Sequence, residues 1–281
     1  MKRFFAMLLL AAVFCTLFAG CAVSKRTEET TEIPTAPEPE RERDENGQFV
    51  FDVPEVMNGL YCSPGLDFAN SEDVEGSDYV NCVILSAYAQ DDLAGQIRLA
   101  IKNGNAFWIN TQFLERGIKK DKHRRKYMSI AENWQEEMER VVATVREEGA
   151  FNYFLGFYMD EPLLNRFSVK NIYDFSKYNH DTFGKRYFIC FAVEGIVPSE
   201  YNDGVTNGHM TKQYSTYITD AAYDMYWDFE TYKDKYERIN EKMKLELPDD
   251  CRIWYIPWAY TTADKSMPAV RLMENQLLAH L

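Results

Sequence analysis

Short, continuous runs of hydrophobic residues alternate along this chain with longer segments in which hydrophobic residues recur at helical spacing. After a short candidate strand at 58–63, six runs have the character of β-strands: 79–88, 106–112, 153–159, 186–193, 221–227 and 252–260. Amphipathic spacing and capping residues predict helices at 92–102, 129–148, 168–183, 231–245 and 268–281. Strands that are apolar throughout and separated by helices are typical of a parallel sheet with both faces covered.

This order predicts an α/β fold of the TIM type, a (β/α)8 barrel, with the run at 153–159 as its fourth strand. Seven strands are counted, one short of eight, and only six remain if residues 60–62 are not a strand. No Gly-rich phosphate-binding turn follows the early strands, which argues against a doubly wound dinucleotide-binding sheet. Because the last helix stays apolar up to Leu281, we expect the barrel to be incomplete at its C-terminus, or its eighth strand to have been miscounted.

The N-terminus has the pattern of an export signal. A charged start, Met1-Lys-Arg, precedes an apolar run at 4–18 that is too short to span a bilayer, and small residues follow. The segment Leu17-Phe-Ala-Gly-Cys21 resembles the lipobox of bacterial lipoproteins, although Phe18 stands where Leu is usual. The resemblance implies that residues 1–20 are a signal peptide and that Cys21 is lipidated; a plain secretory peptide is the alternative.

Residues 21–50 are rich in Thr, Pro and Glu and offer little to bury, so we expect them to be a disordered tether. The folded domain is then 51–281. A tether behind a lipid anchor predicts a protein on the outer face of a bacterial cell membrane, or in the periplasm where an outer membrane exists. The lipid would be its contact with the membrane.

Charge and composition narrow the possible partners. The net charge of −13 argues against nucleic acid, and the one basic cluster, Lys119–Lys126, is short and predicts a solvated loop. The four histidines are scattered, and HExxH and CxxC motifs are absent, so the sequence indicates neither a metal nor another cofactor. Free buried thiols are favoured over disulfides for the four cysteines of the domain, Cys62, Cys82, Cys190 and Cys251.

The fourth strand ends on two carboxylates and a proline, Asp160-Glu161-Pro162. Proline lacks an N–H and keeps the preceding residue extended, so the strand should stop there and leave both carboxylates at the rim of the sheet. Paired carboxylates are the groups that acid/base chemistry uses. An ordinary acidic loop after a core strand is the alternative.

In the fourth-strand position, Gly156-Phe-Tyr-Met-Asp-Glu-Pro162 resembles the strand-four signature of clan A glycoside hydrolases. In that group Asn-Glu or Asp-Glu followed by Pro ends the strand, and the Glu is the general acid/base. The resemblance implies that Glu161 protonates the glycosidic oxygen and that Asp160 orients the substrate or its partner. Those enzymes carry a nucleophilic Glu at the end of strand seven, whereas residues 256–262 contain no carboxylate.

Other strand ends offer substitutes for this second carboxylate: Glu194 closes the fifth strand, while Asp224 and Asp228 flank the sixth. Asp224 lies in an otherwise apolar run, where an unpaired charge is costly, so it should have partners or line a pocket. Glu194, which precedes Gly195, is equally consistent with an ordinary residue at a strand end.

Aromatic residues at the same strand ends suit a sugar-binding site, because flat rings bury the apolar faces of sugars. The predicted substrate-binding residues are Tyr88, Trp108, Asn110, Gln112, Trp227, Asp228, Trp258 and Tyr260. We therefore expect a surface lipoprotein that resembles a glycoside hydrolase and acts on an oligo- or polysaccharide. The main alternative is a non-catalytic carbohydrate-binding lipoprotein on a degenerate glycosidase barrel, and a solute-binding lipoprotein is a weaker third.

Overall fold

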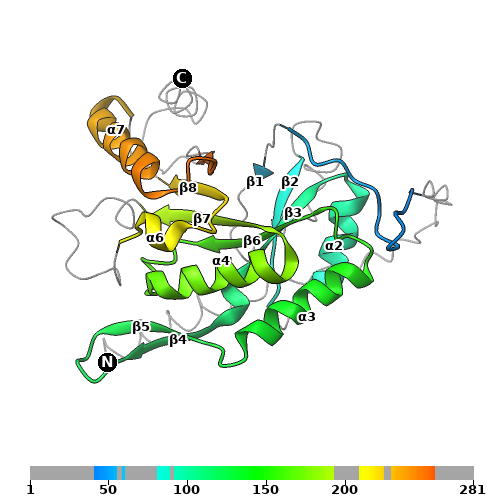
Figure 1. Cartoon of the computed structure of the whole chain (residues 1–281), viewed down its shortest axis with the longest axis horizontal. Coiled ribbons are helices and arrows are strands. Elements are labelled where there is room, and N and C mark those ends of the chain that lie inside the picture. The colour runs from blue at the N-terminus through cyan, green and yellow to red at the C-terminus, as the bar shows by residue number, and fades with distance from the viewer. Residues whose placement is uncertain are drawn as a thin grey trace, which may run out of the picture. The chain divides into compact units, whose positions relative to one another are not determined.

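The computed structural model of the chain describes residues 41–55, 59–60, 81–88, 92–192, 209–224 and 229–256. Seven parallel strands form one sheet in the order β1-β2-β3-β6-β7-β8-β9 (Figure 1). Their bounds are Gly59–Leu60, Cys82–Leu85, Ala106–Asn110, Phe154–Asp160, Arg186–Ala192, Asp220–Asp224 and Arg252–Ile256. The strand that ends at Asp160, β6, is fourth in this order, as the sequence predicts. Among the described residues the edge strands β1 and β9 do not pair, so the sheet is a curled, open part of a TIM-type barrel and not a complete eight-stranded one.

Four described helices match predicted ones: α2 is Leu93–Lys102, α3 is Trp134–Glu147, α4 is Val169–Phe183 and α7 is Phe229–Glu246. The short helix α6, Lys212–Ser215, was not predicted, and the helix predicted at 268–281 lies outside the described residues. Local capping explains their bounds. Asp92 accepts a hydrogen bond from Gly95 N and starts α2, and Ser168 forms a capping box with Asn171 at the start of α4. Gly184, with φ 63°, ends α4 in the left-handed conformation that glycine adopts freely.

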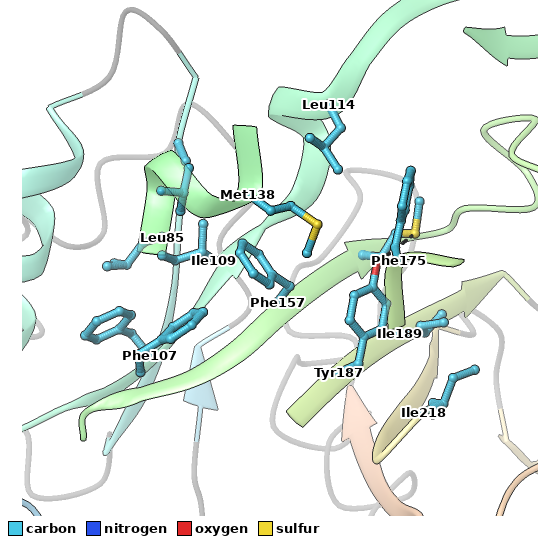
Figure 2. Packing of buried hydrophobic residues seen from close by; sticks show 14 of the residues in the cluster. Leu85, Phe107, Ile109, Leu114, Met138, Phe157, Phe175, Tyr187, Ile189 and Ile218 are labelled. Atoms are coloured by element: carbon cyan, nitrogen blue, oxygen red, sulfur yellow. Dashed lines mark hydrogen bonds between the residues drawn. The ribbon is translucent and has the colours of Figure 1, made fainter. Parts of the chain in front are cut away.

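The main core lies between the sheet and its helices (Figure 2). Alternate strand residues, among them Phe107, Phe157 and Tyr187, face outward and meet Met138 of α3 and Phe175 of α4. Full burial of one such side chain stabilises the fold by roughly 1.5–3 kcal/mol. The outer face of the sheet therefore packs against the helices, and the inner face makes no contribution to this core.

A second cluster fills the inner face of the sheet, and Trp108 lies at its centre. The Trp108 ring is 5.2 Å from that of Phe188, which in turn stacks on Trp254 at 5.1 Å. Only 1% of Trp108 is exposed. Trp108 is therefore a packed residue of the barrel interior, which differs from our expectation that its ring would be available to a sugar.

Gly156 sets which residues of β6 face this interior. The pairing of β3 with β6 shifts register between Phe107 and Trp108, and Gly156 has φ +145°. A β-carbon on Gly156 would lie 1.8 Å from the Arg186 carbonyl oxygen, so no other residue fits there without moving the strands. Leu155 and Tyr158 consequently both pack in the inner cluster, although they are three residues apart.

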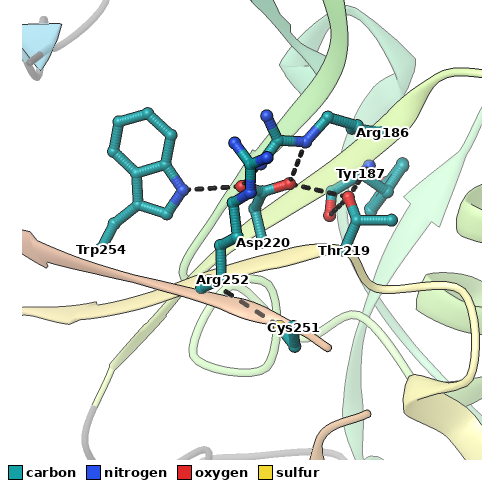
Figure 3. Close-up of polar contacts among 7 residues, drawn as sticks. All are labelled: Arg186, Tyr187, Thr219, Asp220, Cys251, Arg252 and Trp254. Atoms are coloured by element: carbon teal, nitrogen blue, oxygen red, sulfur yellow. Dashed lines mark hydrogen bonds and ion pairs between the residues drawn. The ribbon is translucent and has the colours of Figure 1, made fainter. Parts of the chain in front are cut away.

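The amino ends of β7, β8 and β9 are joined by a buried polar network around Asp220 (Figure 3). The Asp220 carboxylate is fully buried and accepts hydrogen bonds from Arg186 Nε at 2.8 Å, Trp254 Nε1 at 2.7 Å and Thr219 Oγ1 at 2.7 Å. A second nitrogen of Arg186 completes the ion pair. Burial lowers the pKa of Arg186, and the nearby Asp220 opposes this. In barrels this end of the strands serves stability, so we assign the network a structural role.

Two regions differ from the sequence-based expectations. The basic cluster was predicted to be a loop, and the following helix to begin near Ser129. Instead, β4, Glu115–Lys120, and β5, Lys126–Ile130, form an antiparallel hairpin, and α3 begins at Trp134. Short hairpins of mostly polar residues lack the apolar run by which the other strands were recognised.

The expected tether, 21–50, also ends earlier than its predicted boundary. Arg41 donates to Tyr153 Oη at 3.0 Å and to the Lys102 carbonyl at 3.0 Å, and Phe49 N donates to Gly149 O at 2.7 Å. Residues 41–50 are thus hydrogen-bonded to the amino-terminal side of the sheet. Hydrogen bonds made by charged and main-chain groups order this segment, and Phe49 packs against the main core.

Candidate active site at the carboxyl ends of the strands

Asp160 is the last residue of β6 and belongs to the interior face of the sheet. Tyr158 Oη donates a hydrogen bond to Asp160 Oδ1 at 2.9 Å, and Asn165 Nδ2 donates to the Asp160 carbonyl at 3.1 Å. The Tyr158 ring is 1% exposed, whereas Asp160 is partly exposed. Tyr158 and Asp160 are two residues apart on β6, so the alternation of the strand puts both side chains on the inner side. A buried tyrosine therefore orients a carboxylate that solvent can reach.

Glu161 follows in a left-handed backbone conformation, with φ 38°. Its N–H donates to Cys190 O at 2.8 Å, and its carbonyl accepts from Asn165 N at 2.9 Å. Such a conformation costs a non-glycine residue of order 1 kcal/mol or more, and strained residues of this kind cluster at functional sites. The chain therefore leaves the sheet directly after Asp160, as Pro162 led us to expect, with Glu161 at the turning point.

Glu115 is the carboxyl group that sequence reasoning missed. It comes directly after a 3-10 helix, Thr111–Leu114, and begins β4. Burial raises the pKa of Glu115 from an ordinary value of 4.5 to about 7, and the negative charge of Asp160 adds to the shift. Asp160 is 45 residues further along the chain, and a hydrogen bond from Thr111 to Tyr158 joins the loop before Glu115 to the strand that ends at Asp160.

Hydrogen bonds at the end of β3 hold Glu115 in this place. Asn110 Oδ1 accepts from Gln112 N at 3.0 Å and caps the 3-10 helix, while Thr111 Oγ1 donates to the Tyr158 carbonyl at 3.1 Å. The second bond joins the loop after β3 directly to β6. The only sequence signal for Glu115 is its place just after the third strand's end, and that became significant only once the hairpin was known.

Three predicted substrate-binding residues lie at the same edge of the sheet. Tyr88 follows β2, and its hydroxyl donates to Gln112 Oε1 at 3.2 Å. Tyr88 and Gln112 are partly exposed, and Asn110 is buried. Together with Asp160 and Glu115 they form a set of polar groups at the carboxyl ends of β2, β3 and β6, the edge where barrel proteins place their sites.

The other predicted site residues are less fully described. Asp224 is the last residue of β8, where its backbone pairs with Ala192 and Ile256 at the carboxyl end of the sheet. The remaining candidates lie outside the described residues: Cys21, Glu194, Trp227, Asp228, Trp258 and Tyr260.

The pair Glu115 and Asp160 has the electrostatics of an acid and a base. Near neutral pH a carboxyl with a pKa of about 7 keeps its proton in an appreciable fraction of molecules. A carboxyl that keeps its proton near neutral pH can supply that proton to a reacting group beside it. This combination suits transfer of a proton to a leaving oxygen.

The described residues provide neither a metal site nor a reactive thiol. Within the described ranges, no group of three or more His, Cys, Asp or Glu side chains is arranged to hold a metal ion. Cys82 and Cys190 are buried and Cys251 is partly exposed, and all three are thiols that do not take part in disulfides. Burial raises the pKa of Cys82 to about 12, so its thiol stays protonated and unreactive at neutral pH.

None of the helices in the described part of the chain is long and apolar enough to span a membrane.

Comparison with known proteins supports the fold. No family model and no curated protein matches the sequence. Among solved structures, a putative α-L-fucosidase from Bacteroides thetaiotaomicron is 12% identical, with a TM-score of 0.50 over 79% of this chain and 84% of that one.

Two further matches score too low to base an argument on. A glycerol uptake operon antiterminator-related protein from Thermotoga maritima is 11% identical, with a TM-score of 0.33 over 80% of this chain and 97% of that one. A GH30 endoxylanase from Clostridium papyrosolvens is 8% identical, with a TM-score of 0.32 over 66% and 61%. At this level of identity the fucosidase match concerns the fold alone: the chain has a TIM-barrel-like fold of the kind found in glycoside hydrolases.

Proposed function

We propose that this protein hydrolyses a glycosidic bond in an oligo- or polysaccharide, at the carboxyl ends of β3 and β6. The observation that carries the proposal is the pair formed by Glu115 and Asp160 at the edge where barrel enzymes build their sites. The TIM-barrel-like fold is consistent with it, and fucosides belong among the substrates to test because of the structural match.

Two glutamates compete for the role of general acid. The strand-four motif assigns it to Glu161, which also has a strained backbone. Electrostatics favour Glu115, since a general acid works best when its pKa lies near the operating pH. We propose Glu115 as the proton donor and Asp160 as the carboxylate that keeps it protonated, with Glu161 as the second candidate.

Matched variants separate these roles. Glu115→Gln, Glu161→Gln and Asp160→Asn would each be assayed for turnover and binding on aryl glycosides, fucosides among them, and on plant, host and bacterial polysaccharides. Loss of the general acid should lower kcat by about 10²–10⁴-fold while binding is kept. Glu147→Gln, an exposed glutamate on α3, is the control and should behave as wild type. Full turnover in both Glu115→Gln and Glu161→Gln would refute the proposal.

The pH dependence gives a second test. If Glu115 is the acid, activity should fall as the pH rises through about 7, because the proton is lost there. Asp160→Asn removes the neighbouring negative charge, so the fall in activity should occur at a lower pH, whatever the effect on the maximal rate. If activity falls at the same pH in Asp160→Asn and in wild type, Glu115 is not the group that controls the fall.

The alternative is a non-catalytic carbohydrate-binding protein, because residues 256–262 lack a Glu. Clan A glycoside hydrolases, which the strand-four motif resembles, use a Glu at the end of strand seven as their nucleophile. Binding without turnover in the wild type and in every variant would support it. We also propose that the chain is exported and anchored through lipid on Cys21. Incorporation of labelled fatty acid in the wild type, and its absence in Cys21→Ser, is the corresponding measurement.

A further inference from the structure

The β4–β5 hairpin concentrates positive charge in a protein that is otherwise strongly acidic. Residues 116–126 hold seven Lys or Arg and one Asp, a net charge of +6 with His123 neutral. The rest of the chain then sums to −19. The hairpin extends away from the sheet beyond α4 (Figure 1). This local reversal of charge is confined to one structural element.

Most of these cations are exposed and lack an acidic partner among the described residues. Arg116 pairs with Glu137 at 2.8 Å and Arg125 pairs with Asp121 at 2.8 Å. The others make no ion pair within the described ranges, and all are exposed: Lys119, Lys120, Lys122, Arg124 and Lys126. Close like charges repel one another, so such a cluster favours the binding of a negatively charged group.

The tip of the hairpin is built to hold its shape. Asp121 Oδ1 accepts from His123 N at 2.8 Å and Arg125 N at 2.9 Å, and Arg124 turns the chain with φ 63°. Two large hydrophobic side chains are exposed on the strands, Ile118 at 56% and Tyr127 at 39%. An exposed tyrosine beside cations suits a ligand that has both an apolar ring face and negative charge.

The hairpin is rooted at the candidate active site. Its first residue is Glu115, the proposed acid, and Met128 N of its second strand donates to Arg166 O at 2.9 Å. Arg166 lies in the segment that follows Pro162 after β6. Both strands of the hairpin are therefore fixed next to the carboxyl pair, and a chain-like ligand that occupies the site can continue along them.

We propose that the hairpin binds a polysaccharide that carries carboxylate groups, of the polyuronate class, in continuity with the candidate active site. This inference rests on the proposed function and names the class of its substrate. Lys and Arg match the carboxylates, and Tyr127 packs on a sugar ring. Duplex nucleic acid carries one charge per 1.7 Å and would be repelled by the remaining −19. A polyuronate has at most one charge per sugar, and its apolar ring faces match the exposed tyrosine.

The experiment measures binding of the full chain to polygalacturonate by calorimetry, with dextran as the neutral polymer. The hairpin variant is K119Q/K120Q/K122Q, which keeps the Asp121–Arg125 pair and so the turn. Wild type should bind polygalacturonate with an affinity that falls as salt is added. Loss of three exposed charge contacts predicts an affinity about tenfold weaker in the variant.

The control variant, K170Q/K212Q/K244Q, removes the same charge from exposed positions on α4, α6 and α7 and should bind like wild type. Equal binding by the hairpin variant, equal loss in the control, or equal binding of dextran would overturn the inference. So would binding only to vesicles of anionic phospholipid, since that would assign the hairpin to a membrane surface.

The two proposals fail in different ways. Binding of polygalacturonate through the hairpin, without turnover of any glycan, leaves this inference standing and removes hydrolysis. Turnover of a neutral glycan that is unchanged in the hairpin variant, with no binding of polygalacturonate, does the opposite.

Discussion

Replacing Glu115 by Gln should stabilise the protein at high pH and leave it unchanged at low pH. The folded-state pKa of Glu115 is raised from 4.5 to about 7 by burial and by the charge of Asp160. The folded protein therefore holds a proton that the unfolded chain has already released between these values. The stability that Glu115 contributes is fully present below about pH 4.5 and is lost as the pH rises through 7. Glutamine has the same size and stays neutral, so it avoids this loss.

The magnitude follows from the shift. Moving a carboxyl pKa from 4.5 to about 7 corresponds to roughly 3.4 kcal/mol between its two protonation states. Because Glu115 is only partly buried, solvent screening reduces this, and we expect about 1–2 kcal/mol at pH 8. That is a substantial share of the roughly 5–15 kcal/mol that keep a typical domain folded. Strongly perturbed carboxyl groups cluster at functional sites, where catalysis needs a pKa near the operating pH.

The assay is urea unfolding of wild type and Glu115→Gln at several pH values between 4.5 and 8. The difference in unfolding free energy should be near zero at pH 4.5 and grow in favour of Gln toward pH 8. Taking this difference cancels the titrating groups that do not interact with Glu115. A difference that is constant with pH, or a Gln variant that is less stable at pH 8, would refute the raised pKa of Glu115 in the folded protein.

Two further predictions concern the sheet, both read as unfolding free energies. Gly156→Ala should lower the unfolding free energy by about 3 kcal/mol or more, because the new methyl group meets the Arg186 carbonyl. Gly104 also has a positive φ, +72°, but no atom lies within 4 Å of the added methyl group, so Gly104→Ala should cost only about 1–2 kcal/mol. Similar losses in both would contradict the close approach at Gly156. Asp220→Ala leaves the partly buried Arg186 guanidinium without its carboxylate and should cost roughly 3–5 kcal/mol. Asp174→Ala, which breaks the exposed pair with Lys170, should cost less than about 1 kcal/mol. Equal small losses would mean that the buried network contributes little.

The architecture could be predicted because its signals are local. Apolar runs marked the strands of the sheet, and the caps Ser168 and Gly184 marked the ends of α4 to within a residue. The place of β6 as the fourth strand followed from that order. Tyr88, Asn110 and Gln112 were found at the predicted edge because residues at the ends of neighbouring parallel strands lie close together.

The details of the site depend on long-range contacts, which a sequence pattern does not contain. The shift at Gly156 decides that Leu155 shares the inner face with Tyr158, and it occurs where the β7 backbone approaches closely. Trp108 looked like a residue of the rim because it is close to the end of its strand, but its ring packs on Phe188. Glu115 became a site candidate only through a hairpin whose strands are too polar to be recognised.

The binding of residues 41–49 to the amino-terminal side of the sheet has a consequence for how the domain is presented. Arg41 contacts Tyr153 and Lys102, while Asp160 lies at the far end of β6, about 20 Å away along a seven-residue strand. A pull on the chain ahead of Arg41 would therefore act on the pole of the domain opposite the carboxyl pair. If that chain is held at a surface, tension turns the pair outward, and a long polymer can approach it without passing beneath the domain.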